Sequence, residues 1–430
     1  MNIYDLAYLT FSPFIAPVIA WKMFKHNKYK KSIPGMFYFR EHQDEVIPDS
    51  QTIWIHAVSV GEISGAKALI PHLRKLFPNY PIILTVTTET GFSIAKQLEG
   101  KDIDFVRFFP FDLSLNVRRF ITLYQPAMYI GLETELWPNL FIELQNAGTE
   151  IFILNGRISR SAMKKYRMAA CLFSKILRPV KAFGMQTSVD AQNMSTLIGR
   201  SDNIIVTGNI KLDIAPTQYL KQELTDFRHT CNIKDKSLIV TWGSTHEGEE
   251  EIAIRVLLDS DCFENEESIA IIVPRHPERF QTVYKLLVES GVTVVRYSDQ
   301  SVTLGKLKRK AVLIDAMGLL NKVYAMSDIG IVAGSFVDNI GGHNILEPAV
   351  YKIPVLYGKN MWGQPDMLRI LDGFGGIMCS NERIGDTITD LLNDSTRRHD
   401  VGEKVFAAVD NNRGAVVKSI KIIQNHMQCR

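Results

Sequence analysis

The chain has 430 residues, of which 46% are hydrophobic and 22% charged, and its formal net charge is +3. This length exceeds what a single hydrophobic core supports, so two domains are expected, and the composition excludes an intrinsically disordered protein. The small net charge gives no support to nucleic-acid binding by bulk electrostatics. Five scattered cysteines without CxxC spacing argue against a disulfide framework and a zinc site, and they favour a reducing compartment.

The N-terminal segment is more apolar than the rest of the chain. Residues 3–24 (IYDLAYLTFSPFIAPVIAWKMF) are about as long as a membrane-spanning helix, but they contain Asp5, Pro13 and Pro17. Several lysines follow directly, and positive charge on this flank assigns the remainder of the chain to the cytoplasm. The sequence predicts a membrane anchor over residues 1–30. The alternative is a buried first helix of the globular body.

A first α/β domain is predicted over residues 31–207, where short apolar runs alternate with glycine-bearing loops and amphipathic helices. Strands separated by helices form a parallel sheet that is covered on both faces. Ligands of such sheets bind beyond the carboxyl ends of the strands. The predicted strands are 52–58, 81–86, 105–108, 127–130, 151–154 and 182–185.

A second α/β domain is predicted over residues 218–430, after a polar, proline-bearing segment (208–217) that suits a hinge. The simplest account of the whole chain is two doubly wound, Rossmann-like domains that face one another across a cleft. The predicted strands of the second domain are 238–242, 269–273, 292–297, 312–315 and 329–333.

Three acids follow strands of the first domain. Glu62 lies in SVGE, where a strand gives way to a helix, and a carboxylate there can take a proton from an attacking hydroxyl. The alternative is a helix-terminal acid that only complements the helix dipole. Glu133 and Glu135 flank Thr134 and would share one face, so each would perturb the protonation of the other. The alternative is a pair of acids that binds a neighbouring arginine.

The second domain contains a strand, a glycine loop and a helix over residues 334–349 (GSFVDNIGGHNILEPA). Gly341 and Gly342 allow close approach of a ligand, and the helix start after them suits a phosphate. Glu347 is placed to accept hydrogen bonds from sugar hydroxyls. An ordinary turn with a solvated Glu347 remains the alternative.

Arg275 and His276 of VPRHPERF follow another strand of the second domain, and cationic donors at a strand end suit a phosphate or a carboxylate. His246 lies beside Glu247 and Glu249 in a loop. This cluster is more typical of hydrogen bonding than of metal binding.

No acidic residue occurs between Glu150 and Asp190, although the segment is rich in basic residues. A surface of one sign near an anchor would attract anionic lipid headgroups. The alternative is a solvated basic helix paired with acids elsewhere. The basic residues are Arg157, Arg160, Lys164, Lys165, Arg167, Lys175, Arg178 and Lys181.

The ordered motifs HAVSVGEISG, TVTTETG, PFD, ETELWPN, NGRIS, QTSVDA, GNIKLD, GSTHEGEEE, VPRHPERF, DAMGLLNKVYAMSD and GSFVDNIGGHNILEPA run from the N-terminal segment to about Gly358. Together they resemble the 3-deoxy-D-manno-octulosonate (Kdo) transferases of lipopolysaccharide assembly, the lipid IVA Kdo transferases. The resemblance implies a GT-B glycosyltransferase fold. It also implies that the N-terminal domain binds the acceptor and the C-terminal domain binds the CMP-sugar.

The resemblance implies an inverting transfer without a metal or cofactor, in which Glu62 is the general base. The implied partners are CMP-Kdo, lipid IVA and an anionic membrane surface, with no nucleic acid, at the cytoplasmic face of a bacterial inner membrane. The implied acceptor-binding residues are Ser59, Gly61, Thr87, Thr88, Glu133, Glu135 and Arg157. The implied CMP-binding residues are Ser244, Thr245, Arg275, His276, Ser335, Gly341, Gly342, Asn344 and Glu347.

Two segments depart from the family pattern. Residues 358–367 (GKNMWGQPDM) stand where the family often has a GPH-like turn and an NF-x-E segment, and PGMFYFREH matches the family's usual run after the anchor poorly. Neither departure affects Glu62. Two alternative functions remain, which are a different GT-B enzyme with another nucleotide sugar and lipid acceptor, and an inactive, membrane-docked nucleotide-sugar binding protein.

Overall fold

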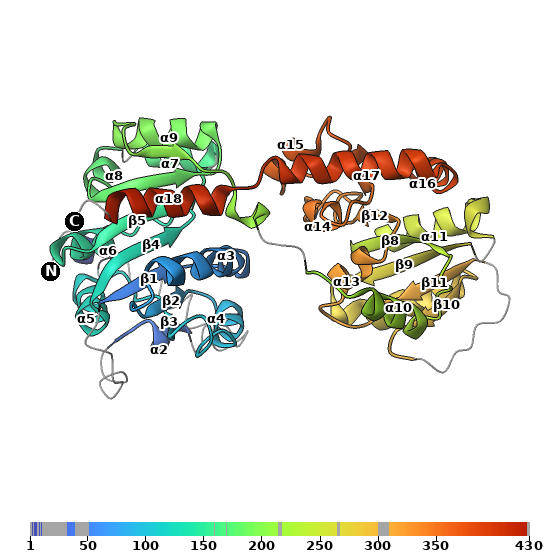
Figure 1. The fold of residues 1–430 in the computed structure, drawn as a ribbon, viewed down its shortest axis with the longest axis horizontal. Coiled ribbons are helices and arrows are strands. Elements are labelled where there is room, and N and C mark those ends of the chain that lie inside the picture. Colours follow the sequence, from blue (N-terminus) through green and yellow to red (C-terminus); the bar gives the residue numbers. More distant parts are fainter. Residues whose placement is uncertain are drawn as a thin grey trace. The chain divides into compact units, whose positions relative to one another are not determined.

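A computed structural model describes residues 2, 4–6, 8, 10, 32–38, 51–158, 160–168, 170–213, 217–264, 267–299 and 309–427. The chain forms two compact units, each with its own core (Figure 1). Unit 1 comprises Met1–Ile214 and Arg413–Arg430, and unit 2 comprises Ala215–Asn412.

Unit 1 is built on a seven-stranded parallel sheet in the order β3-β2-β1-β4-β5-β6-β7. The six strands predicted for this domain are confirmed, and β7 was missed because it has only three residues, two of them exposed. The strands are β1 (Thr52–His56), β2 (Ile82–Val86), β3 (Phe105–Phe108), β4 (Pro126–Leu132), β5 (Glu150–Gly156), β6 (Val180–Met185) and β7 (Ile204–Val206).

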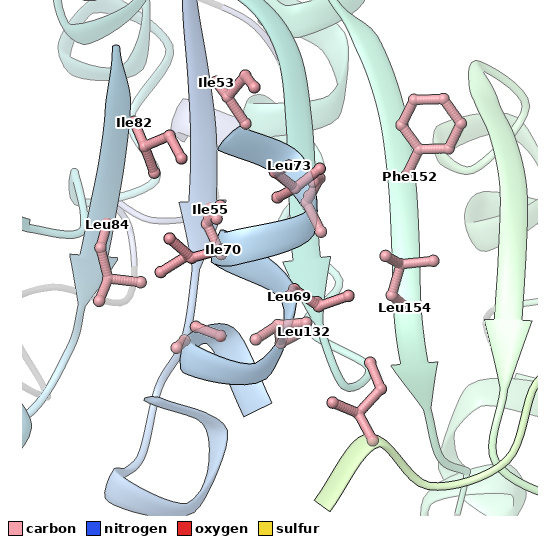
Figure 2. Close-up of a cluster of buried hydrophobic side chains, with 14 of the residues drawn as sticks. Ile53, Ile55, Leu69, Ile70, Leu73, Ile82, Leu84, Leu132, Phe152 and Leu154 are labelled. Carbon is pink, nitrogen blue, oxygen red and sulfur yellow. The ribbon is translucent and has the colours of Figure 1, made fainter. Parts of the chain in front are cut away.

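Helices cover both faces of this sheet, so the central strands are buried along their whole length. Successive side chains point to opposite faces. Ile53 and Ile55 of β1 therefore pack against Leu69 and Leu73 of α3 in one core (Figure 2), whereas Trp54 belongs to the other core. The helices are α2 (Ser32–Gly35), α3 (Val60–Leu76), α4 (Glu89–Lys96), α5 (Ser114–Tyr124), α6 (Pro138–Asn146), α7 (Arg160–Met168), α8 (Ala170–Ile176), α9 (Ser188–Ile198) and the 3₁₀ helix η1 (Ile210–Leu212).

The C-terminal helix α18 (Ala415–Met427) belongs to unit 1, so the predicted second domain over 218–430 extends too far. Figure 1 shows this helix in red among the blue and green elements of unit 1. Ile420 and Ile423 of α18 join the core that contains β1 and α3. Asp213 accepts hydrogen bonds from the backbone N atoms of Gly414 at 2.7 Å and Val416 at 2.5 Å, and so caps the helix.

Unit 2 has a second seven-stranded parallel sheet, in the order β10-β11-β9-β8-β12-β13-β14. The five predicted strands are confirmed, and the two short strands β13 and β14 were missed. The strands are β8 (Leu238–Thr245), β9 (Ser268–Pro274), β10 (Thr293–Arg296), β11 (Lys310–Leu313), β12 (Ile329–Val332), β13 (Val355–Tyr357) and β14 (Ile377–Met378).

Helices of unit 2 also pack on both faces of its sheet, because β8 contributes Val240 and Trp242 to one core and Ile239 to the other. The helices are α10 (Lys221–Thr230), α11 (Glu249–Asp259), η2 (Asp261–Phe263), η3 (Pro277–Arg279), α12 (Phe280–Glu289), α13 (Leu320–Ala325), α14 (Leu346–Ala349), α15 (Pro365–Leu371), α16 (Ile384–Asn393) and α17 (Ser395–Asp410).

Most of the predicted anchor over residues 1–30 lies outside the described residues. Its described start is joined to α5 and α6, because the Asp5 carboxylate accepts hydrogen bonds from the Ser114 backbone N at 2.8 Å and from Asn139 Nδ2 at 3.1 Å. Asp5 is only 4% exposed, as in the alternative interpretation of a helix packed on the globular body. In the part of the chain that the structure describes, no helix has both the length and the apolar character needed to cross a membrane.

Candidate active site

The carboxyl ends of β1 and β4 mark the point in unit 1 where the strand order reverses. In doubly wound sheets this reversal opens a site for ligands. The segment after β1 carries Ser59 and Glu62, and the segment after β4 carries Glu133 and Glu135. The sheet topology therefore brings the predicted base and the predicted acid pair to the same edge.

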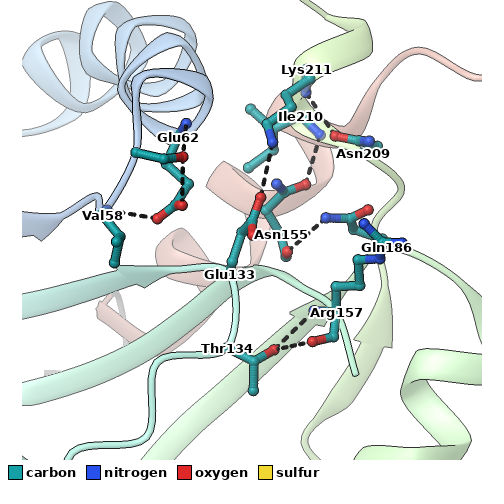
Figure 3. Close-up of polar contacts among 11 residues, drawn as sticks. Val58, Glu62, Glu133, Thr134, Asn155, Arg157, Gln186, Asn209, Ile210 and Lys211 are labelled. Atoms are coloured by element: carbon teal, nitrogen blue, oxygen red, sulfur yellow. Dashed lines mark hydrogen bonds and ion pairs between the residues drawn. The ribbon is translucent and has the colours of Figure 1, made fainter. Parts of the chain in front are cut away.

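Glu62 is held at the N-terminus of α3 by a reciprocal capping arrangement (Figure 3). Its Oε1 accepts a hydrogen bond from Ser59 Oγ at 2.8 Å, and its Oε2 accepts one from the Val58 backbone N at 2.7 Å. The side chain is 6% exposed. Burial raises the pKa of Glu62 and the charge of Glu133 raises it further, whereas the two hydrogen bonds and Lys211 oppose the shift.

Lys211 is the nearby cation of this edge. Its Nζ lies 2.9 Å from Glu133 Oε1, with both side chains about one-third exposed (31% and 30%). The same ammonium lies against Gly61, where an added Cβ would be 3.3 Å from Nζ. Glu133 itself has a positive φ of 61°, an unfavourable conformation for a non-glycine residue that is often found at functional sites.

Hydrogen bonds tie the loops after β4, β5 and β7 together (Figure 3). Thr134 Oγ1 donates to the Arg157 backbone O at 2.7 Å and accepts from the Arg157 backbone N at 2.9 Å. Asn155 Oδ1 accepts from the Ile210 backbone N at 3.0 Å. The predicted residue Arg157 thus fixes the loop of Glu133 and Glu135 through its backbone, and its side chain is exposed.

Glu135 is the second acid of the predicted pair. Burial and then the charge of Glu62 raise the pKa of Glu135 to about 6. The pKa of this carboxyl is therefore displaced toward neutrality in the same region as Glu62, which is a feature of many acid–base sites. The alternative interpretation expected an arginine beside the two acids, and the cation that pairs with Glu133 is Lys211.

The two predicted threonines after β2 have different environments. Thr88 caps α4, because its Oγ1 accepts from the Gly91 backbone N at 3.1 Å. Among the described residues, Thr87 Oγ1 has no hydrogen-bond partner although it is buried. Buried polar atoms without partners are uncommon, so this hydroxyl is a candidate for contact with a ligand or with water.

In unit 2 the strand order reverses between β8 and β12, and the segments after these strands carry most of the predicted CMP-binding residues. Two of those residues use their hydroxyls internally. Thr245 Oγ1 donates to Glu250 Oε1 at 2.8 Å, and Ser335 Oγ donates to the Val332 backbone O at 2.6 Å and accepts from the Gly358 backbone N at 2.7 Å. Both side chains are 0% exposed, so they support the loops and do not line a surface.

The glycine pair after β12 forms a closed turn. Gly341 and Gly342 have φ values of 91° and 84°, and the Gly342 backbone N donates to the Gly334 backbone O at 2.8 Å. An added Cβ at Gly342 would lie 2.3 Å from Met361 Sδ. Because α14 has only four residues, the predicted strand, glycine loop and helix end in a single helical turn. Packing of the loop is a sufficient reason for these glycines.

Other predicted CMP-binding residues lie at the same edge of unit 2. Ser244 has a positive φ of 61° directly before Thr245, and Arg275 and His276 are exposed after β9. Asn344 Nδ2 donates to Glu347 Oε1 at 3.4 Å. Burial raises the pKa of Glu347, and the charge of Arg275 opposes that shift, which indicates that the two side chains are near one another.

Comparison with known proteins assigns the chain to a family. Residues 31–214 match the family model described as 3-deoxy-D-manno-octulosonic-acid transferase (kdotransferase). The 3-deoxy-D-manno-octulosonic acid transferase of Haemophilus influenzae is 30% identical over 99% of this chain and 98% of its own length. The chain belongs to the Kdo transferase family. The enzyme of the same description from Chlamydia trachomatis serovar A is 27% identical over 100% of this chain and 97% of its own length.

The transferase also shares its fold with solved structures. A glycosyltransferase from Rickettsia africae has a TM-score of 0.59 at 15% identity, over 88% of this chain and 98% of its own. A UDP-GlcNAc 2-epimerase from Neisseria meningitidis has a TM-score of 0.58 at 13% identity, over 89% of this chain and 100% of its own. Together with the two parallel sheets, these similarities show the GT-B fold. The transferase is a glycosyltransferase that transfers Kdo in lipopolysaccharide synthesis.

Sequence reasoning missed two residues of the Kdo transferase. Lys211 was not selected because GNIKLD was interpreted as a hinge, and in the structure it lies in η1, after the short strand β7 that was also missed. His343 was not selected either, and it contacts His246, which was expected to form hydrogen bonds. Among the described residues, no three His, Cys, Asp or Glu side chains are grouped as a metal site would require.

Proposed function

We propose that this Kdo transferase moves Kdo from CMP-Kdo onto lipid IVA by an inverting, metal-independent displacement, with Glu62 as the general base. The observation that supports this proposal best is the buried Glu62 carboxylate at the reversal point of unit 1. Each of its oxygens accepts one hydrogen bond, from Ser59 or from Val58, and has a second lone pair, so the carboxylate can still take a proton. Its raised pKa makes it a stronger base than an exposed glutamate.

In the proposed step, Glu62 removes the proton from a primary hydroxyl of the acceptor sugar. The hydroxyl oxygen bonds to the anomeric carbon of Kdo, and the bond from that carbon to the phosphate oxygen breaks. CMP leaves with the electron pair. Arg275 lies at the edge of unit 2 that we assign to CMP, and its guanidinium suits a leaving phosphate.

The test is transfer of Kdo from CMP-Kdo, generated in situ, to lipid IVA in detergent, with Glu62→Gln beside the wild type. We expect product with the wild type and a loss of about 10²- to 10⁴-fold in rate with the variant. UDP-sugars offered in parallel should give no product. Folded wild-type enzyme that binds CMP without forming product would contradict the acceptor assignment, whereas a fully active Glu62→Gln would contradict the mechanism.

Unit 1 provides a matched control for the capping role of Glu62. Asp190 at the start of α9 accepts from Thr187 Oγ1 at 2.5 Å and from the Ile158 backbone N at 2.8 Å, an arrangement close to that of Glu62 with Ser59 and Val58. Asp190→Asn removes the same kind of helix cap, so it should cost stability of about 1 kcal/mol and change the rate of the folded enzyme by only a few-fold.

We propose in addition that the enzyme works on an anionic membrane surface, at the cytoplasmic face of the inner membrane. Lys164, Arg167, Lys175 and Arg178 are exposed on and beside α7 and α8, and Met168 between them is 91% exposed. Lys181 differs because it pairs with Glu150 at 3.3 Å. The test is sedimentation with vesicles that contain anionic lipid. Lys164→Glu combined with Arg167→Glu should weaken binding, and unchanged binding would contradict this role.

A further inference from the structure

Two histidines meet where the strand order of unit 2 reverses. His246 directly follows β8, and His343 lies in the loop after β12, the strand that pairs with β8. Their Nε2 atoms are 2.8 Å apart, and the two rings are nearly parallel, with an interplanar angle of 15° and centroids 5.0 Å apart. Neither contact was expected from the sequence.

A separation of 2.8 Å between two imidazole nitrogens requires a single hydrogen between them. One Nε2 carries the hydrogen and donates, and the other accepts, so at least one ring is neutral. A first added proton binds to the free nitrogen of the donating ring and leaves the hydrogen bond intact. A second proton would place two N–H groups face to face and break the contact. The hydrogen-bonded pair can therefore carry one positive charge but not two.

The pair has mainly cationic neighbours. The His276 ring lies 5.2 Å from that of His246 at an interplanar angle of 76°, and Arg275 is next to it in the chain. Burial and then these neighbouring charges lower the pKa of His246 and of His343 to about 4, so both are neutral near pH 7 when no ligand is bound.

The nearby carboxylates are occupied by other partners. Glu249 accepts from the backbone N atoms of His246, Gly334 and Phe336. Glu250 binds Arg279 through two hydrogen bonds, at 2.7 and 3.1 Å. Glu278 lies 3.8 Å from His276, and Glu347 is bonded to Asn344. Glu247 and Glu251 act on Arg279. Among the described residues, none of these carboxylates forms an ion pair with Arg275 or with the histidine pair, although the charges of Glu347 and Arg275 act on one another.

The position of His343 is fixed by its surroundings. Gly334 has a φ of 72°, and a Cβ there would lie 2.8 Å from His343 Cδ2 and 3.0 Å from Nε2. The absence of a side chain at Gly334 thus makes the room in which the imidazole lies.

We propose that His246 and His343 act as one proton-accepting unit that binds the phosphate of the nucleotide donor, and that the pair takes up a proton when the phosphate arrives beside Arg275. This inference rests on the proposed function, because it assigns the nucleotide to unit 2. The anion adds a negative charge beside Arg275, and the protonated pair then donates a charge-assisted hydrogen bond to it. Affinity for the nucleotide therefore falls as the pH rises.

The test is calorimetry of CMP binding to the full-length enzyme at pH 6.5, in two buffers that differ in ionisation enthalpy. The difference in apparent enthalpy gives the number of protons taken up. The phosphate of CMP itself titrates near this pH, so proton uptake is compared between wild type and variant and is not taken from either protein alone. We expect the wild type to take up roughly half to one proton more than His343→Gln, and its affinity to fall about 10-fold more between pH 6 and pH 8.

Cytidine, which lacks the phosphate, should bind without this uptake. His246→Gln should behave like His343→Gln, and it provides a second variant should the first fail to fold. His229→Gln is the matched control, because His229 is an exposed histidine of unit 2 beside Asp235, and it should keep the uptake. Absence of CMP binding by the wild type would refute the proposed function. CMP binding with equal proton uptake in wild type and both variants would refute the histidine pair alone.

Discussion

The two units have the same kind of sheet, but the edges at which their strand order reverses carry different titratable side chains. Unit 1 places Glu62, Glu133 and Glu135 at this edge with Lys211 as the nearby cation. Unit 2 places Arg275 at this edge with His246, His276 and His343. The difference comes from the loops, because the parallel strands and covering helices are alike.

These different side chains suit different tasks of a glycosyl transfer. An acceptor hydroxyl must lose a proton, which requires a carboxylate with a raised pKa. A nucleotide donor brings and releases an anion, which requires cationic donors. In both units the pKa shifts are caused first by burial, and this raises the pKa of the acids and lowers the pKa of the histidines.

The largest effect on this comparison should come from removing the fixed charge of unit 2. Arg275→Met should weaken CMP binding by about 10- to 100-fold, since charge-assisted hydrogen bonds contribute roughly 1.5–3 kcal/mol. The loss should be similar at pH 6 and pH 8, because an arginine stays charged. Titration with CMP at both pH values measures it. Arg397→Met, at an exposed arginine paired with Asp390, is the control. An unchanged CMP affinity of Arg275→Met would contradict a role of Arg275 in binding the phosphate.

A second, smaller effect should follow from removing the cation of unit 1. The charge of Lys211 lowers the pKa of Glu62, so Lys211→Met should raise that pKa and move the acid limb of the pH–rate profile to higher pH. On the acid limb, below the pKa, a shift of one pH unit corresponds to a loss of about 10-fold in kcat/KM, with a much smaller loss on the plateau well above the pKa.

Lys211→Arg retains the charge, so its acid limb should stay in place. Lys181→Met removes a lysine that pairs with Glu150 elsewhere in unit 1, and it should leave the profile unchanged. An acid limb that does not move in Lys211→Met would show that Lys211 does not set the charge state of Glu62.

A third prediction separates loop support from ligand contact in unit 2. Ser335→Ala leaves the buried Gly358 backbone N without its acceptor, so it should destabilise unit 2 by about 1–3 kcal/mol. The CMP affinity of the folded variant should change by less than about 3-fold. Urea unfolding and CMP titration measure the two effects. Ser395→Ala, at an exposed residue, is the control. A stable variant that no longer binds CMP would show that Ser335 contacts the nucleotide.

The fold was largely predictable, because buried parallel strands are apolar along their whole length and glycine-bearing loops separate them from helices. The strands β7, β13 and β14 were missed since they have only two or three residues each, too few for a periodic pattern. The sequence of α18 shows that it is a helix, but nothing local indicates that it packs on unit 1. The packing of α18 on unit 1 depends on its cap, Asp213, and on the core of β1 and α3, and both are distant in the sequence.

The site was predictable where chemistry and topology coincide. Glu62 follows the first strand of a doubly wound sheet, and this position alone makes it a candidate. Thr245 and Ser335 show what could not be predicted. The sequence does not indicate whether a hydroxyl bonds to a neighbouring group of the protein, as these two do, or faces a ligand. Lys211 and His343 were missed because their partners, Glu133 and His246, lie far away in the chain.

The smallest expected effect is an opposite pH dependence of stability at the two edges. The pKa of Glu135 is raised to about 6, so the folded state holds more protons than the unfolded state between about pH 4.5 and 6. The contribution of Glu135 to the free energy of unfolding therefore decreases as the pH rises. The pKa of His343 is lowered to about 4, so the unfolded state holds more protons than the folded state between about pH 4 and 6.5. The contribution of His343 to the free energy of unfolding therefore decreases as the pH falls.

Glu135→Gln should therefore stabilise unit 1 at pH 8 relative to pH 4.5, and His343→Gln should stabilise unit 2 at pH 5 relative to pH 8. Each difference should be about 1 kcal/mol, since solvent screening reduces the effect at partly exposed side chains. His343→Gln also removes the hydrogen bond to His246. Because that loss is the same at both pH values, it cancels when the two measurements on the variant are compared. Urea unfolding at the two pH values measures both. If the two variants shift stability in the same direction with pH, the two edges do not differ in charge as the structure implies.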